Sequence, residues 1–144
     1  MMLSIPDQFD ALQRVREHLV PGGRFILDIF APDVRMLADD SNQPFHFRDV
    51  HDPSTGHILS LWHQDRWDHL HQINNARLKI DERNKENNVI AKFVREFQIR
   101  CIYRYEMQHL LSLCGFRLLE LYGGFDRRSF DDVSEDMVWV TEAR

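Results

Sequence analysis

Cysteine is scarce in this sequence, with only two among 144 residues. Cys101 falls in a strand pattern and Cys114 ends a helix pattern, so we expect two buried free thiols rather than a disulfide framework. A catalytic thiol is disfavoured at Cys114, because the negative end of a helix dipole raises the pKa of a thiol. The cysteine pattern is typical of a cytoplasmic protein.

Long hydrophobic runs are also missing. No apolar stretch approaches the roughly 20 residues that a membrane-spanning helix needs. The segment 1–7 has no basic start and no long apolar core, so it does not resemble a signal peptide. We therefore expect no interaction with a membrane.

Positive charge is in short supply. The net charge is −5, and only three lysines are present, Lys79, Lys85 and Lys92. Binding to a nucleic acid backbone needs a dense basic surface, which scattered arginines do not provide. Nucleic acid is therefore excluded as a main partner.

The loops that mark several enzyme classes are absent as well. The sequence has no P-loop and no G-x-S-x-G turn around a serine nucleophile. Eight histidines are present, and His69 and His71 would share one face of a strand. A metal site needs three or four converging ligands, and histidines at loops and strand edges are usually solvated, so no metal is expected.

What the sequence does have is organised around residues 20–30. A helix with Ser4 as its N-cap and apolar residues at helical spacing precedes this stretch. Pro21, Gly22 and Gly23 end the helix and turn the chain. Residues 25–30 then form a short, almost continuous apolar run, which predicts a strand buried on both faces of an α/β sheet. Residues 34–37 are predicted to make one or two helical turns.

A different pattern covers residues 45–102, where no helical period occurs. Apolar and polar residues alternate around 58–62, 74–80 and 89–101, which favours an antiparallel sheet with one buried face and one solvent-exposed face. Turn residues at 52–56 precede the first of these strands, and 84–88 predict a hairpin between the other two. We expect a meander of three or four strands.

Helical spacing returns near the C-terminus. Met107, Leu110, Leu111 and Cys114 lie on one helix face, and Gly115 stands at the position of a left-handed helix end. Residues 117–122 predict a strand, 125–136 an acidic loop and 137–141 a last strand.

Several sequence segments, taken in their order along the chain, resemble the C-terminal half of class I methyltransferases that use S-adenosylmethionine. They are LVPGGRFILD at 19–28, YRYEMQHLLSLCGF at 103–116, LYGGFD at 121–126, SF at 129–130 and MVWV at 137–140. The insert resembles the antiparallel lid of members that act on small molecules. The resemblance implies an α/β fold, the C-terminal half of a Rossmann-like methyltransferase sheet with a β-meander insert. Its parts would be 1–45, the insert 46–102, and 103–144 with the last helix and closing strands.

The first half of that family pattern is absent from this sequence. Its cofactor site needs a Gly-rich turn after the first strand and an acidic residue after the second, and none of the six glycines forms such a turn. We therefore expect no cofactor-binding residues in this chain, and no tight binding of S-adenosylmethionine by the chain alone. It would be a truncated methyltransferase, inactive by itself.

A missing neighbour strand would leave one edge of the strand 25–30 bare. An exposed apolar edge recruits another chain. The expected partner is a second copy of this chain, giving a homo-oligomer, or a complete methyltransferase, together with a small-molecule acceptor. Two alternatives remain: a non-catalytic partner subunit, and a small-ligand binding module built on the antiparallel insert.

Seven residues are candidates for a substrate pocket. Asp28 and Phe30 lie near the carboxyl end of their strand, where α/β sheets bind ligands, although Asp28 could equally be a hydrogen-bonded strand-end residue. Arg104 could hold an anionic substrate or cap a sheet edge. The remaining candidates are aromatic residues that could line an apolar pocket or simply belong to the core: Trp62, Tyr103, Tyr105 and Phe125.

Overall fold

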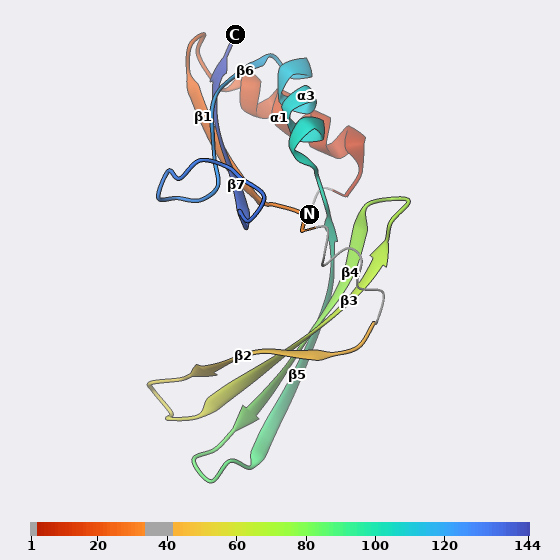
Figure 1. Ribbon diagram of the computed structural model, residues 1–144, viewed down its shortest axis with the longest axis vertical. Coiled ribbons are helices and arrows are strands. Elements are labelled where there is room, and N and C mark those ends of the chain that lie inside the picture. Colours follow the sequence, from red (N-terminus) through yellow and green to blue (C-terminus); the bar gives the residue numbers. More distant parts are fainter. Residues whose placement is uncertain (1–2, 34–41) are drawn as a thin grey trace. The chain divides into compact units, whose positions relative to one another are not determined.

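The structure is a computed structural model that describes residues 3–33 and 42–144 (Figure 1). The described residues divide into two compact units. One unit contains residues 3–33 and 101–144, and the other contains residues 42–100. The helical turns predicted at 34–37 lie outside the described residues. No described helix is long and apolar enough to cross a membrane.

The first unit combines two helices with a three-stranded antiparallel sheet. The strand order is β1-β7-β6, so β1 is an edge strand that pairs with β7. Both helices lie on the same side of this sheet (Figure 1). The elements are α1 (Ile5–Glu17), β1 (Arg24–Phe30), α3 (Arg104–Leu113), β6 (Phe116–Tyr122) and β7 (Asp136–Ala143).

Local sequence signals account for the ends of both helices. The Ser4 hydroxyl accepts a hydrogen bond of 3.2 Å from the backbone N–H of Asp7, which confirms the predicted N-cap of α1. Gly115 follows the C-cap of α3 with a φ of +83°, a left-handed conformation that glycine adopts without steric cost. Gly22, with a φ of +79°, makes the turn between α1 and β1.

The core of this unit lies between the helices and one face of the sheet. Trp139 and Met137 of β7 are fully buried. The ring of Phe116 in β6 packs at a tilt against that of Phe25 in β1, with 5.5 Å between the ring centroids. Leu111 of α3 packs into the same cluster. Apolar residues at helical spacing on α3 and at alternate positions on β7 meet here, as the sequence periods require.

The prediction that β1 is buried on both faces is wrong for the described residues. Its side chains alternate, and Phe25, Leu27 and Ile29 pack on the core while Ile26 is 60% exposed. An unbroken apolar run does not reveal which faces are covered, because coverage depends on the elements that pack there. The second face of β1 is therefore open within this unit.

The second unit is a four-stranded antiparallel meander, and the alternation predicted three of its four strands. The strands are β2 (Phe45–His51), β3 (Ile58–Asp68), β4 (Ile73–Arg83) and β5 (Val89–Arg100), in the order β2-β3-β4-β5. Asp52 and Gly56 close the β2–β3 turn through a backbone bond of 2.8 Å, and the backbone N–H of Asn84 donates to Asn88 at 3.0 Å in the predicted hairpin.

The two faces of this meander differ in chemistry. Cross-strand partners point to the same face, and successive residues point to opposite faces. The row formed by Gln64, Arg77 and Glu96 therefore belongs to a polar face. The row formed by Leu61, Ile80 and Phe93 belongs to an apolar face, where Phe93 is 52% exposed. No helix occurs among residues 42–100 to cover that apolar face.

Candidate functional site

Two of the predicted pocket residues lie on the helix-free face of the three-stranded sheet. Asp28 pairs with Val138 across the strands, and Phe30 pairs with Asp136, near the carboxyl end of β1. Both side chains are exposed, so Asp28 is not a buried member of the core. Their position is compatible with a pocket wall, which stays a prediction.

A hollow of about 420 Å³ occupies the same face of this sheet. The predicted residue Phe125 lines it together with Ile26 and Tyr122, and two arginines, Arg24 and Arg127, also contribute. Ile26 and Tyr122 are not among the predicted pocket residues, although the one-residue offset of Ile26 from the core positions of β1 places it on this face. The lining thus combines apolar and aromatic side chains with two arginines and one carboxylate, that of Glu120.

The three remaining candidates of this unit are consecutive residues at the start of α3. The Arg104 guanidinium lies 5.2 Å from the ring centroid of Tyr105 and 5.7 Å from that of Phe130. Tyr103 is the N-cap residue of the helix, and burial, followed by the charges of Cys101 and Glu106, raises the pKa of its phenol. The Arg104 guanidinium therefore makes cation–π contacts with aromatic rings. Arg104 is the first residue of α3, so it does not cap a sheet edge.

The seventh candidate, Trp62, belongs to the other unit. Its ring lies 5.2 Å from that of His46 in an edge contact, and the ammonium of Lys79 lies 5.9 Å from the ring centroid. The seven predicted residues are thus distributed over two units. Three share the helix-free face, three share the start of α3, and Trp62 lies on the polar face of the meander.

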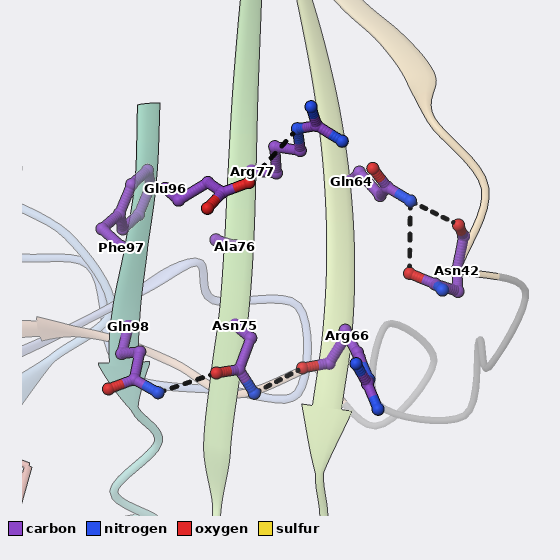
Figure 2. A pocket seen from close by; sticks show the side chains of 9 residues that line it. All are labelled: Asn42, Gln64, Arg66, Asn75, Ala76, Arg77, Glu96, Phe97 and Gln98. Atoms are coloured by element: carbon purple, nitrogen blue, oxygen red, sulfur yellow. Dashed lines mark hydrogen bonds and ion pairs between the residues drawn. The ribbon is translucent and has the colours of Figure 1, made fainter. Parts of the chain in front are cut away.

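A polar trough of about 510 Å³ crosses β3, β4 and β5 (Figure 2). The strand register arranges its lining in two rows of three polar side chains. One row consists of Gln64, Arg77 and Glu96, and the other of Arg66, Asn75 and Gln98.

Hydrogen bonds connect the side chains along the trough, as Figure 2 shows. The Gln98 amide donates to the Asn75 side-chain oxygen at 2.8 Å, and the Asn75 amide donates to the backbone oxygen of Arg66 at 3.3 Å. Arg77 and Glu96 form an ion pair of 3.5 Å across β4 and β5. Amide, guanidinium and carboxylate groups offer both donors and acceptors here, which suits a polar ligand.

Four histidines of the meander lie within hydrogen-bond distance of a carboxylate: His46, His57, His63 and His71. His57 lies 2.6 Å from Glu82, and His71 lies 2.8 Å from Asp68. Within residues 3–33 and 42–144, no group of three or more histidine, cysteine, aspartate or glutamate side chains is placed to hold a metal ion.

No family model matches the chain, and no curated protein matches its sequence. Solved structures do match. The CcbJ methyltransferase from Streptomyces caelestis aligns with 99% of this chain and 56% of its own, at 24% identity and a TM-score of 0.79. An S-adenosylmethionine-dependent methyltransferase from Clostridium acetobutylicum aligns with 99% of this chain and 53% of its own, at 14% identity and a TM-score of 0.73.

A third match is CalS10 from Micromonospora echinaspora, an amino pentose methyltransferase whose structure contains S-adenosylmethionine. It covers 98% of this chain and 52% of its own, at 13% identity and a TM-score of 0.70. The chain therefore has the fold of part of an S-adenosylmethionine-dependent methyltransferase. It spans about half the length of the solved structures that it matches. The predicted partial Rossmann-like fold with an antiparallel insert is confirmed.

The glycines do not fit a cofactor cradle. Such a cradle needs open space beside a glycine at the carboxyl end of a strand. Gly123 directly follows β6, but a Cβ there would run into the Ser134 side chain, and Gly124 lies against Asp126 and Arg128. The other four glycines lie in the turns before β1, β3 and β6. None of the six glycines therefore combines open space with a position directly after a strand.

Proposed function

We propose that this chain is part of an S-adenosylmethionine-dependent methyltransferase that acts on a small molecule. The observation that carries the proposal is the alignment of 99% of the chain with the CcbJ methyltransferase at a TM-score of 0.79. A likeness over the whole chain is more informative than one restricted to a common α/β core. In this proposal the chain contributes walls of the acceptor pocket, and further polypeptide supplies the donor site.

The acceptor walls would come from the carboxyl end of β1 and the start of α3. Asp28 and Phe30 occupy the first position, and Arg104 with Tyr105 occupies the second. Ligands of α/β sheets bind beyond the carboxyl ends of strands, which supports the choice of β1. The role of these side chains would be to position the acceptor atom, since orientation supplies much of the rate of a group transfer.

Calorimetry with this polypeptide tests the proposal. S-adenosylmethionine and S-adenosylhomocysteine should give no saturable heat up to about 1 mM with the chain alone, which means a binding free energy weaker than about −4.1 kcal/mol. Tight one-to-one binding by the isolated chain would contradict the view that the donor site lies elsewhere. A methyltransferase co-purifying with the tag-free protein would identify the missing polypeptide.

A second candidate function is a small-ligand binding module on the antiparallel sheet. The trough of Figure 2 favours it, because its two rows of side chains present donors and acceptors over three strands. If the chain is only a binding module, methyl transfer would be absent even when a donor-binding polypeptide is added. Restored methyl transfer in the complex separates the first function from this one.

A further inference from the structure

Besides the trough in Figure 2, the polar face of the meander has a separate hollow, which shares no lining residue with the trough. Its volume is about 330 Å³, within the range of small-molecule sites. The polar lining residues are His46, Asp49, Ser60, Trp62, Arg83 and Asn87, which come from β2, β3, β4 and the β4–β5 turn. We call this hollow the Trp62 pocket.

Part of the Trp62 pocket is held in place by internal hydrogen bonds. The Nε2 atom of His46 lies 2.8 Å from an oxygen of Asp49, and a hydrogen bond from Ser60 reaches the same carboxylate. Ser60 itself is buried, at 5% exposure. The His46 ring contacts Trp62 edge-on. These contacts hold one edge of the indole and the carboxylate of Asp49 in place before any ligand binds.

Three buried polar atoms around this pocket have no hydrogen-bond partner within the described part of the chain. They are Nε1 of Trp62, Nε of Arg83 and Oδ1 of Asp81. Trp62 and Arg83 line the pocket, and Asp81, 5% exposed, stands opposite the lining residue Ser60 in the strand register. Buried polar groups are nearly always paired, so three unpaired atoms on one patch indicate a missing hydrogen-bonding group.

We propose that the Trp62 pocket binds a neutral polyhydroxylated ring, such as a pyranose. Two N–H donors and a carboxylate acceptor match hydroxyl groups, because a hydroxyl both accepts and donates. The carboxylates of Asp49 and Asp81 would repel an anionic ligand. The cationic side chains of Arg83 and Lys79 would repel a cationic one. The flank of the Trp62 ring offers apolar surface for the C–H groups of such a ring.

Binding requires a small local adjustment. The unpaired atoms of Trp62 and Arg83 are covered in the present side-chain arrangement, so the lining side chains must turn to expose them. Changes of side-chain rotamer are common on binding. Asn87 is the exposed lining residue at the rim, and its side-chain oxygen accepts a hydrogen bond of 3.4 Å from the Arg83 guanidinium. The site is independent of methyl transfer and of the donor.

Tryptophan fluorescence tests this site in the full chain. In a Trp67→Phe background, emission comes from Trp62 and from the fully buried Trp139 of the other unit. Methyl β-D-glucopyranoside is the neutral probe, methyl β-D-glucuronide the anionic one and methyl β-D-glucosaminide the cationic one. We expect a saturable change with the neutral probe and at least about tenfold weaker binding of both charged probes.

Matched variants locate the binding. Arg83→Leu and the milder Trp62→Phe, which keeps an aromatic ring but removes Nε1, should each weaken the neutral probe about tenfold. Because Trp62→Phe also removes the reporter, its titration is followed by saturation-transfer NMR of the probe. Arg95→Leu makes the same substitution on the opposite face of the sheet and should leave binding unchanged.

Three results would overturn the proposal. They are no saturable signal with the neutral probe in a folded protein, preference for a charged probe, or loss of binding in Arg77→Leu of the trough instead of Arg83→Leu. If Arg83→Leu does not fold, as judged by circular dichroism, Asn87→Ala at the exposed rim replaces it and should also weaken binding.

Discussion

The hydroxyl of Thr141 donates a hydrogen bond of 2.9 Å to the backbone carbonyl of Phe25 and so joins β7 to the edge strand β1. Thr141 is fully buried, and 116 residues separate it from Phe25 along the chain. This side-chain bond supplements the backbone ladder at the strand that carries Asp28 and Phe30. Because this hydrogen bond joins residues far apart in the sequence, its removal should lower the free energy of unfolding.

Thr141→Val replaces the hydroxyl by a methyl group of similar volume. The loss of one buried hydrogen bond should lower the free energy of unfolding by about 1 kcal/mol. Urea unfolding followed by circular dichroism measures this difference. Thr141→Ser serves as the control, because it removes the methyl group and keeps the hydroxyl that donates to Phe25. Equal loss in both variants would mean that the contact with Phe25 contributes nothing particular.

Asp52 should make the meander sensitive to acid. Its carboxylate accepts hydrogen bonds from the hydroxyl and backbone N–H of Ser54 and from the hydroxyl of Thr55, which lowers its pKa from 3.8 to about 2. A lowered folded-state pKa contributes stability above the unfolded-state pKa near 3.8, and that contribution is lost as pH falls towards 2.

The corresponding experiment compares Asp52→Asn with the unmodified chain in urea at several pH values. The unmodified chain should be the more stable of the two above pH 4, and the difference should shrink between about pH 4 and pH 2. Ser54→Ala removes the donor with the largest effect and should flatten the same part of the profile. A difference that persists unchanged at pH 2 would mean that the loss in Asp52→Asn is not electrostatic.

The sequence predicted the parts of the fold that depend on local chemistry. Ser4 caps α1, Gly115 ends α3 and the turn at Asn84 closes its hairpin, because each needs only its neighbours in the chain. Strand β2 was not located, since the sequence FHFRDVH places a bulge between His46 and Arg48 that breaks the alternation.

The candidate site was less accessible to sequence analysis. The aromatic character of Trp62 and Phe125 was visible, but the unit to which each belongs and the hollow that each lines depend on tertiary pairing. The rows of the trough follow from strand register, and a shift of one residue would have sent Gln64 to the other face. Spacing in the sequence does not specify that register.

The two cysteines should be protected from thiol reagents in the folded chain. Cys101 and Cys114 are each 1% exposed, and burial raises the pKa of the Cys114 thiol, which lowers the thiolate fraction. Labelling by a chromogenic disulfide should be on the order of a hundredfold slower in buffer than in denaturing urea. Rapid reaction of one thiol in buffer would contradict the packing of α3 against α1, where the Cys114 thiol approaches the Phe9 carbonyl at 3.9 Å.

The helix-free face of β1 should determine association of the chain. Ile26 is 60% exposed and lines the hollow beside Val138 and Val140, and an apolar strand face at a sheet edge favours a partner. Ile26→Lys places a charge in the middle of that face. Light scattering coupled to size exclusion should show a mass above that of one chain for the unmodified protein and a shift towards the monomer for Ile26→Lys.

Leu70→Lys is the matched control for Ile26→Lys, because Leu70 is 85% exposed in the β3–β4 turn of the other unit. It adds the same charge and removes a comparable apolar side chain, so it corrects for a general gain in solubility. If association used exposed apolar residues without regard to position, both variants would reduce the mass equally. A reduction confined to Ile26→Lys assigns the interface to the sheet face of β1, the face on which donor-binding polypeptide would have to pack to complete a two-sided α/β sheet.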